Sequence, residues 1–488
     1  MVGKELRKSG HSRIVGVTAA GAGLVLSATL LTPTAAAEVP VWPSSVRAAL
    51  PSNLQLPATT TTADYLPTLI KRLKKRSRAK SLGRKTVSVF VSDLETGQKV
   101  FKRRAGKARI PASVMKSATA LAVMSARGAY HQFTTSVTRS ADGLVLTLVG
   151  GGDPLLDSND LKALAAETAA ALATQGSPAG RLRLQVDDSI FAAPTHPSGW
   201  PSHYYPNYAR KPFGLTRRWV AANDGAIDAG KYFRKELKRA VKELTGTGLR
   251  VRRKVTRPIP GGDIAPPPAT PIPSESTTAP TPAASPTPAV SPTDVAAATG
   301  SGVIATFAEH SVMDAVNVML PSSDNSIAEN LIRHVAAAKD MPTTTTGAAA
   351  AVTAELKRLQ IPMRRIRIVD GSGLSRQNQL TAKAATAINR AMMDPARPEL
   401  ALGIFAMPRA GVTGTLSRRF GTGLTRCARD KVMAKTGTLS NVVSLSGVAG
   451  ARDGRPRAFT IFINNFRSST TSARYWTDAM ATAVTGCG

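Results

Sequence analysis

Acidic residues are the main shortage in this 488-residue chain, which contains 31 Asp and Glu but 64 Lys and Arg. The resulting formal net charge of +33 predicts attraction to an anionic partner. Nucleic acid, anionic lipid and acidic polymers all meet that description, so charge alone does not choose among them. With 42% hydrophobic and 19% charged residues, the composition is nonetheless that of a globular protein.

Long apolar runs are also rare, and the clearest one lies at the N-terminus. A basic start, Met1–Arg13, precedes a mostly apolar stretch from Ile14 to Leu31, and Ala35-Ala36-Ala37 then forms a small-x-small cleavage pattern. These features predict a secretory signal peptide over residues 1–37, with a retained membrane anchor as the alternative. Either way the remaining chain is exported, to the cell wall or beyond, and no later segment has transmembrane length. Export excludes nucleic acid as the partner and favours an anionic cell-envelope polymer.

Cysteine is limited to Cys427 and Cys487. An even pair in an exported protein suggests a disulfide, with two free buried thiols as the alternative. Neither cysteine has a His or Cys neighbour at metal-ligand spacing, and the six histidines are scattered. The sequence therefore predicts no metal site, and no histidine belongs to a recognisable Ser-His-Asp signature.

The length predicts two or three domains rather than one. Residues 258–300 are rich in Pro, Ala, Thr and Ser, a composition that cannot bury a core and predicts a disordered or extended insertion. Alternating patterns predict a hairpin over residues 86–101 and three consecutive strands within 431–464. Consecutive strands with helices packed on them indicate an α+β or α/β sandwich fold.

Ser113-Val114-Met115-Lys116 is the first of three short motifs that suggest catalysis. A serine and a lysine three residues apart share one helix face, so a neutral lysine there can take the serine proton. Burial in the apolar segment 113–126 would lower the lysine pKa, and the helix start favours developing negative charge. Alone the motif is weak, because Ser77-Arg78-Ala79-Lys80 repeats it in a basic run without an apolar helix.

Two further motifs follow along the chain: Ser323-Asp324-Asn325 and Lys435-Thr436-Gly437-Thr438. The first offers a hydroxyl and a carboxamide from a short loop, although a helix N-cap uses the same residue types. The second ends a predicted strand and supplies hydroxyl donors and positive charge for a carboxylate. Its glycine would let a substrate backbone approach the strand edge. Taken singly, each motif is better explained as a structural feature.

Together, Ser-x-x-Lys, Ser-Asp-Asn and Lys-Thr-Gly are the signature of penicillin-binding proteins and class A β-lactamases. Ser113 and Ser323 lie 210 residues apart (323 − 113), far more than a single β-lactamase-like domain places between these motifs. The chain therefore resembles the D-alanyl-D-alanine carboxypeptidase/endopeptidases of the penicillin-binding protein 4 type, class C low-molecular-mass penicillin-binding proteins. Other stretches resemble the same family: Gly150–Pro154, Val186–Phe191, Asp324–Leu331 and Asp370–Arg376.

The resemblance implies an α+β fold. Its β-lactamase/transpeptidase-like domain has an antiparallel sheet with helices on both faces, and smaller β-rich domains are inserted between the first two motifs. We therefore expect the catalytic domain in two parts, at residues 38–135 and 301–488, with the inserted domains at 136–300.

The resemblance also implies roles for single residues. Ser113 would be acylated, Lys116 would be its base, and Ser323 would relay a proton to the leaving amine. Asn325 would bind the substrate amide, and Lys435 would maintain the electrostatic field. Backbone N–H groups of Ser113 and Thr438 would form the oxyanion hole. The expected substrate-binding residues are Thr436, Gly437, Thr438, Asp153 and Arg376.

The implied reaction is acyl transfer on the stem peptides of peptidoglycan, without a metal or organic cofactor. Cleavage of a terminal D-alanine makes the enzyme a carboxypeptidase, and cleavage of a cross-link makes it an endopeptidase. β-Lactams would acylate Ser113 because their strained amide mimics the D-alanyl bond. One alternative is a β-lactamase, although no dedicated deacylating carboxylate is evident. The other is a catalytically silent wall-binding protein, which the intact motif residues argue against.

Overall fold

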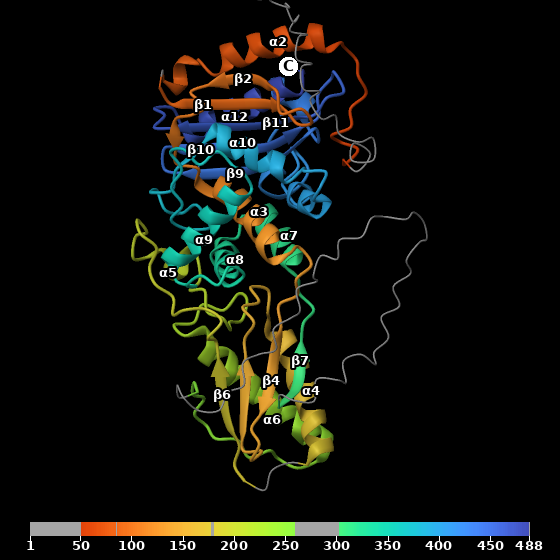
Figure 1. Cartoon of the computed structure of the whole chain (residues 1–488), viewed down its shortest axis with the longest axis vertical. Coiled ribbons are helices and arrows are strands. Elements are labelled where there is room, and N and C mark those ends of the chain that lie inside the picture. The colour runs from red at the N-terminus through yellow and green to blue at the C-terminus, as the bar shows by residue number, and fades with distance from the viewer. Residues whose placement is uncertain (1–49, 84, 177–179, 259–301, 488) are drawn as a thin grey trace, which may run out of the picture. The chain divides into compact units, whose positions relative to one another are not determined.

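The computed structural model describes residues 50–83, 85–176, 180–258 and 302–487 (Figure 1). The expected signal peptide and nearly all of the Pro-rich stretch lie outside these residues. Within the described ranges, no helix has the length and apolar character needed to cross a membrane.

A five-stranded antiparallel sheet combines strands from the N-terminal and the C-terminal parts of the described chain, in the order β2-β1-β11-β10-β9. Its strands are β1 (Val87–Asp93), β2 (Lys99–Arg103), β9 (Val432–Leu439), β10 (Val442–Ala449) and β11 (Arg457–Asn464). β1 and β2 form the predicted hairpin, and β9 to β11 are the three predicted C-terminal strands. Pairing of Val89 with Ile461 joins these distant segments into one sheet.

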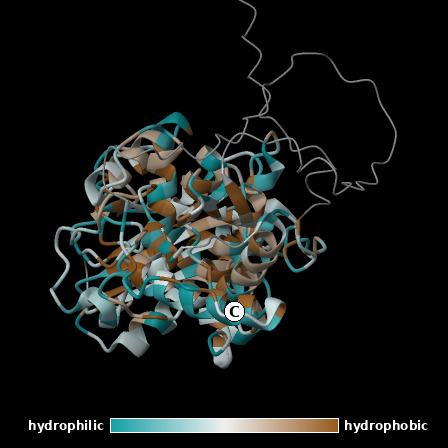
Figure 2. Ribbon diagram, turned by 90° about the horizontal axis from the view of Figure 1, so that it is seen from below, coloured by the Kyte–Doolittle hydropathy of each residue, from teal (hydrophilic) through white to brown (hydrophobic). Residues whose placement is uncertain are grey.

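Helices cover both faces of this sheet, as expected. Side chains alternate along a strand, so Ile461 and Ile463 of β11 enter one hydrophobic core while Phe462 enters another. The first core is closed by α2 (Thr62–Arg76) and α12 (Thr470–Val484), and the second by α10 (Ala382–Ala391). In Figure 2 hydrophobic residues gather toward the interior of the molecule, and hydrophilic residues lie mostly on helices and loops at its margin.

The second core continues into a group of packed helices beside the sheet. These helices are α3 (Met115–Arg127), α7 (Val312–Ser322), α8 (Asn325–Ala337), α9 (Thr345–Arg358) and the short α11 (Leu402–Phe405). A small two-stranded sheet, β3 (Ala108–Arg109) with β8 (Leu380–Thr381), lies at their margin. Helix α3 is buried on most faces and ends before Gly128, as its apolar sequence predicts.

A second sheet, in the order β6-β5-β4-β7, has a hydrophobic core of its own. Its strands are β4 (Thr135–Arg139), β5 (Val145–Val149), β6 (Arg183–Asp187) and β7 (Val303–Phe307), and its helices are α4 (Ser158–Gln175) and α6 (Gly225–Thr245). The short helix α5 (Tyr204–Asn207) packs elsewhere, in a separate cluster with Trp200 and Leu374. Helices α4 and α6 pack together against the second sheet, so helices contribute more residues than strands to an insertion expected to be β-rich. β7 pairs with β4, so this sheet extends past the boundary expected at residue 300.

Candidate active site

Ser113 lies in a tight 3-10 turn, Ala112–Val114, directly before helix α3. The turn is held in a strained conformation, because Ala112 is buried with φ at +48°. Gly373 presses against it, and a Cβ added to that glycine would lie 1.9 Å from the Ala112 carbonyl oxygen. Backbone strain of this kind gathers at functional sites, where the surrounding structure can hold it.

Lys116 is fully buried and points its amine back at the serine. Its Nζ lies 3.1 Å from Ser113 Oγ, 2.7 Å from Asn325 Oδ1 and 2.7 Å from the carbonyl oxygen of Ser372. Burial lowers the pKa of Lys116 to about 8, although the charges of Asp370, Glu329 and Asp324 oppose that shift. A neutral amine keeps two of these donations and accepts the proton of Ser113 through its lone pair. The Ser-x-x-Lys geometry therefore suits general-base activation of the serine.

The Ser-Asp-Asn motif forms the junction between helices α7 and α8. Ser323 ends α7 with φ at +62°, and Asp324 caps α8 by accepting the N–H of Ile327 at 3.0 Å. The N-cap explanation is therefore correct for the middle residue. Asn325 accepts Lys116 through Oδ1, and its Nδ2 donates to the carbonyl oxygen of Tyr208 at 2.8 Å. One amide hydrogen and one oxygen lone pair of Asn325 are left for a substrate.

Lys435 is also fully buried, and it lies on the edge strand β9. Its Nζ donates to the carbonyl oxygen of Thr436 at 3.1 Å. Burial, together with the charge of Lys116, holds the pKa of Lys435 well below its ordinary value. Two buried amines thus lie within electrostatic reach of each other, from segments more than 300 residues apart in sequence.

Gly437 also has a packing role that its position in the sequence does not reveal. The strand does not end at the motif but continues to Leu439. A Cβ at Gly437 would lie 2.7 Å from the Pro111 carbonyl oxygen and 3.0 Å from the backbone nitrogen of Ser113. The glycine therefore lets the serine turn pack against β9, and its expected contact with a substrate backbone stays a prediction.

The other expected substrate-binding residues are distributed unevenly. Thr436 is nearly buried and its hydroxyl lies 2.8 Å from that of Thr415, whereas Thr438 is exposed and 3.4 Å from an Arg474 nitrogen. Arg376 is exposed and donates to the carbonyl oxygen of Ser440 at 3.0 Å, just beyond the end of β9. The structure thus brings the Lys-Thr-Gly threonines and Arg376 to one strand and its following turn.

Asp153 is not brought to the motif residues. Its buried carboxylate lies 2.8 Å from His310 Nδ1 and accepts the N–H of Leu155 at 2.8 Å. The pKa of His310 is raised, first by this hydrogen bond. Both partners lie close to the strands of the second sheet in sequence, so these contacts hold Asp153 in place there, and its substrate-binding role stays a prediction.

Two buried carboxyl groups that act on Lys116, those of Glu329 and Asp370, belong to none of the three motifs. Glu329 Oε1 accepts the N–H groups of Gly371 at 3.1 Å and Ser372 at 2.8 Å, which orients the Ser372 peptide whose carbonyl oxygen faces Lys116. Burial, and then the charge of Asp370, raises the pKa of Glu329 to about 7. Both carboxyl groups lie in stretches whose family resemblance is visible in the sequence, but no spacing rule connects them to Lys116.

Asp370 ties the inserted segment to this loop. It accepts hydrogen bonds from the N–H of Gly373 at 2.7 Å and from Nε1 of Trp200 at 2.7 Å. Ser375 Oγ donates to the carbonyl oxygen of Ser198 at 2.7 Å, beside the same tryptophan. The loop that contacts Lys116 is therefore braced from both the helical core and the insertion.

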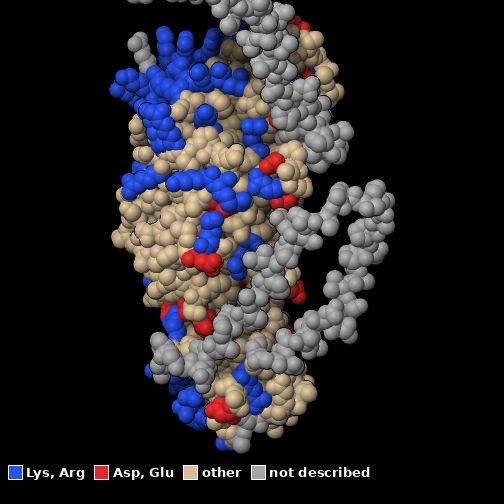
Figure 3. Space-filling view, viewed as in Figure 1, with Lys and Arg blue, Asp and Glu red and all other residues tan. Residues whose placement is uncertain are grey.

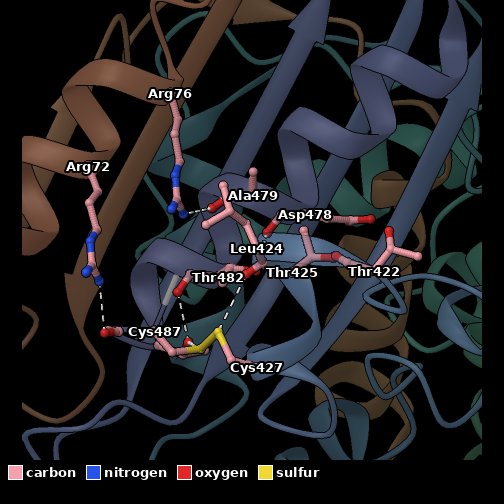
Figure 4. The surroundings of a disulfide bond; sticks show 12 residues. Arg72, Arg76, Thr422, Leu424, Thr425, Cys427, Asp478, Ala479, Thr482 and Cys487 are labelled. Atoms are coloured by element: carbon pink, nitrogen blue, oxygen red, sulfur yellow. Dashed lines mark hydrogen bonds between the residues drawn. A yellow bond between two sulfur atoms is a disulfide. The ribbon is translucent and has the colours of Figure 1, made fainter.

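Cys427 and Cys487 are joined in a disulfide, the pairing that the sequence suggests. The bond ties the segment after β8 to the end of α12 (Figure 4). Arg72 and Arg76 of helix α2 point at the same region, where they donate to the carbonyl oxygens of Gly486 and Ala479. No cluster of three or more His, Cys, Asp or Glu in the described ranges has metal-binding geometry.

Comparison with known protein families decides the classification. The model of the D-Ala-D-Ala carboxypeptidase 3 (S13) family matches residues 69–216 and 292–486. The chain belongs to this family. The matched residues include all three motifs, and residues 217–291, which contain α6, fall outside the match.

Named relatives agree with that classification. Carboxypeptidase Rv3627c of Mycobacterium tuberculosis is 30% identical over 409 residues, which cover 82% of this chain and 80% of the relative. D-alanyl-D-alanine carboxypeptidase of Actinomadura is 28% identical over 431 residues, 78% of each chain. The crystal structure of penicillin binding protein 4 (dacB) from Haemophilus influenzae matches with a TM-score of 0.63 at 18% identity, over 84% of this chain and 97% of that one.

These findings confirm the predicted family, the α+β transpeptidase-like fold and the enzyme class. The chain is a serine-type peptidase of the D-Ala-D-Ala carboxypeptidase/endopeptidase kind. The similarity to the Haemophilus structure supports the fold. The roles of single residues are not addressed by these similarities and depend on the geometry described above.

Proposed function

We propose that this peptidase removes the terminal D-alanine from peptidoglycan stem peptides through an acyl-enzyme formed at Ser113. The observation that carries the proposal is the buried amine of Lys116, 3.1 Å from the serine hydroxyl and with a pKa lowered to about 8. An amine with that pKa is partly neutral near pH 7 and can accept the serine proton as the oxygen attacks the carbonyl carbon.

The tetrahedral intermediate needs donors for its oxyanion, and we assign the backbone N–H groups of Ser113 and Thr438. Close packing of Gly437 on the serine turn supports this assignment, because it puts both N–H groups on adjoining backbone. Collapse of the intermediate breaks the peptide C–N bond, and Ser323 passes a proton to the leaving amine. Water then hydrolyses the acyl-serine, with the same lysine as the base.

Substrate orientation falls to residues around the serine. Asn325 has one free amide hydrogen for the substrate carbonyl, while the hydroxyls of Thr436 and Thr438 donate to the terminal carboxylate, whose negative charge in turn favours the protonated form of Lys435. Arg474, 3.4 Å from the Thr438 hydroxyl, adds a second cation at the exposed end of that site. Arg376, which is exposed just beyond the end of β9, would contact the substrate at the edge of the site. A stem peptide that ends in D-alanine supplies the carboxylate that these groups bind, so we propose carboxypeptidase activity, with endopeptidase activity where a cross-linked peptide carries a carboxylate at the same position.

We also propose that the enzyme works outside the cytoplasm, with residues 1–37 as its export signal, and that β-lactams acylate Ser113. An anionic polymer of the cell envelope is the proposed second partner, on the basis of the net charge of +33.

The direct test is labelling of the mature chain with a fluorescent penicillin, beside a Ser113→Ala control, together with release of D-alanine from a stem pentapeptide. Label and D-alanine release in the wild type alone support the proposal. Label that persists in the control would move the nucleophile away from Ser113. Rapid nitrocefin turnover without D-alanine release would favour the β-lactamase instead, and a folded wild type that neither labels nor releases D-alanine would be catalytically silent.

A further inference from the structure

The positive charge of the chain is concentrated in one short part of the described structure. Residues 71–107 contain 14 Lys and Arg against two acidic residues. Those that are exposed on helix α2, on strand β2 and beside them are here called the basic surface: Lys71, Lys74, Lys75, Arg78, Lys99, Lys102 and Arg104. Blue side chains gather densely in Figure 3 where Figure 1 shows α2 and β2, which pack together.

Within the described residues, the lysines of this surface are not neutralised by carboxylates. The two acidic residues, Asp93 and Glu95, are buried, and Asp93 pairs with Arg455 at 3.0 Å and Arg457 at 3.1 Å. Among the described residues, none of the lysines of the basic surface forms an ion pair with a carboxylate. Burial of Arg103 and the charges of Arg104 and Arg78 lower its pKa, so the ends of α2 and β2 share one positive field.

Helix α6 offers an instructive contrast because it is also rich in basic residues. There Arg239 pairs with Glu243 at 2.8 Å and Lys235 with Glu236 at 3.5 Å, so part of the charge is balanced locally. On α2, by contrast, basic side chains three and four residues apart face solvent together, which destabilises a helix by a few tenths of a kcal/mol per pair. Edge-strand lysines alone can be explained as protection against aggregation, but that explanation does not extend to α2.

The way α2 packs decides what kind of partner fits. Its apolar residues Tyr65, Leu69 and Leu73 are buried in the core shared with α12. A helix that lies in a membrane must turn its apolar face toward lipid, whereas the main apolar face of α2 is buried in the protein and Leu66, Pro67 and Ile70 stay partly or fully exposed beside it. Lysine ammonium groups are mobile point charges that suit repeated phosphates without fixed geometry, whereas planar, two-point recognition requires arginine.

We propose that the basic surface of α2 and β2 is a docking site for a linear, phosphate-bearing polymer of the cell envelope. This proposal rests on the proposed function, because it requires the enzyme to be located outside the cytoplasm. β2 and β9 are opposite edges of the five-stranded sheet, four strand spacings or about 19 Å apart. A polymer bound at β2 therefore leaves the serine site on the β9 side open, and holds the enzyme beside its substrate.

The test compares two triple variants that remove equal charge. Lys71→Glu/Lys74→Glu/Lys75→Glu alters the basic surface, and Lys231→Glu/Lys238→Glu/Lys242→Glu alters exposed lysines of α6. Binding to linear inorganic polyphosphate is measured between 50 and 200 mM salt. We expect the α2 variant to bind at least tenfold more weakly and with a shallower salt dependence, and the α6 variant to stay within about threefold of the wild type.

Penicillin acylation of each variant is the control for folding, since no altered residue lies at the serine site. If the glutamates disturb α2, the neutral variant Lys71→Gln/Lys74→Gln/Lys75→Gln keeps the helix and is expected to weaken binding at least threefold. Equal losses from α2 and α6 would overturn the site in favour of overall charge. Binding only to phosphatidylglycerol vesicles would overturn it in favour of lipid. A wild type that is acylated but ignores polyphosphate would overturn the docking site and leave the peptidase intact.

Discussion

The Ser-x-x-Lys pattern occurs twice in this chain, and its two copies have opposite surroundings. Ser77 follows α2, where its N–H donates to Leu73 and its hydroxyl points to the Lys74 carbonyl oxygen, while Lys80 is exposed to solvent. Lys116 is fully buried and contacts Ser113 together with groups 209 and 256 residues away in sequence. The spacing of the serine and the lysine therefore does not by itself make the lysine a general base.

What separates the two copies is the medium around the amine. A lysine ammonium group in water stays protonated near pH 7. Burial disfavours the charged form and lowers the pKa of Lys116 to about 8. The carbonyl and amide oxygens around it also orient the amine toward the serine. Helix α3 supplies the burial, and the loop at Ser372 and the start of α8 supply the acceptors.

The largest effect should come from removing the lysine from each copy. Lys116→Ala leaves no group to take the serine proton, and we expect penicillin acylation to slow by about a thousandfold or more. Lys80→Ala should change the acylation rate by less than twofold, because that amine is in solvent. Stopped-flow or gel-based acylation rates distinguish the two. A comparable loss from both variants would contradict the distinction between the copies.

A second effect should come from disturbing the contact between the serine turn and β9. In Gly437→Ala the added Cβ meets the Pro111 carbonyl oxygen at 2.7 Å, which displaces the turn and misplaces the oxyanion donors. We expect acylation to fall by about a hundredfold, the magnitude seen when one such donor is lost. Gly421→Ala is the matched control, since its Cβ would meet no atom within 4 Å. Unchanged acylation in Gly437→Ala would show that the turn tolerates the shift.

The pH dependence sharpens the comparison further. Acylation needs neutral Lys116, so its rate should rise with pH to a plateau, with a midpoint near the pKa of about 8. An ionised Glu329 stabilises the charged lysine, so Glu329→Gln should move the midpoint to lower pH and raise the rate at pH 7 a few-fold. The glutamine side chain keeps an Oε1 acceptor for the N–H groups of Gly371 and Ser372. A midpoint that stays fixed or moves upward in this variant would exclude Glu329 as a determinant of the Lys116 pKa.

The smallest effect on acylation should follow loss of the disulfide, which lies near the non-catalytic copy. Cys427→Ser/Cys487→Ser opens a loop with a sequence separation of 60 residues. The chain-entropy model predicts a loss of about 4 kcal/mol in the free energy of unfolding, measurable by denaturant titration. Arg72 of α2 contacts the same terminus, so α2 should be loosened, while acylation of the folded variant stays within twofold of the wild type. A tenfold loss of acylation would show that the two regions are coupled.

Much of the candidate site could be predicted from the sequence, because a motif states residue types at short spacings. Ser113 and Lys116 share a helix face by helical periodicity alone, and the order of the three motifs identifies the family. The hairpin and the three C-terminal strands follow from alternation of apolar residues, which depends only on near neighbours. The packing role of Gly437 could not be predicted because its neighbour, Pro111, is more than 300 residues away in sequence. The contact of Asp153 with His310 could not be predicted for the same reason, since 157 residues separate them.

By itself, then, the sequence determined the catalytic residue types, the α+β class and the excess of positive charge, since these are properties of composition and local pattern. The apolar segment around Lys116 also predicted its burial, but only the tertiary structure decided which acceptors and carboxyl groups surround this lysine and where the positive charge gathers on the surface. The physical reason is that desolvation and electrostatic interaction depend on distance in space. Residues that are 209 or 256 positions apart in the chain act on Lys116 as nearest neighbours.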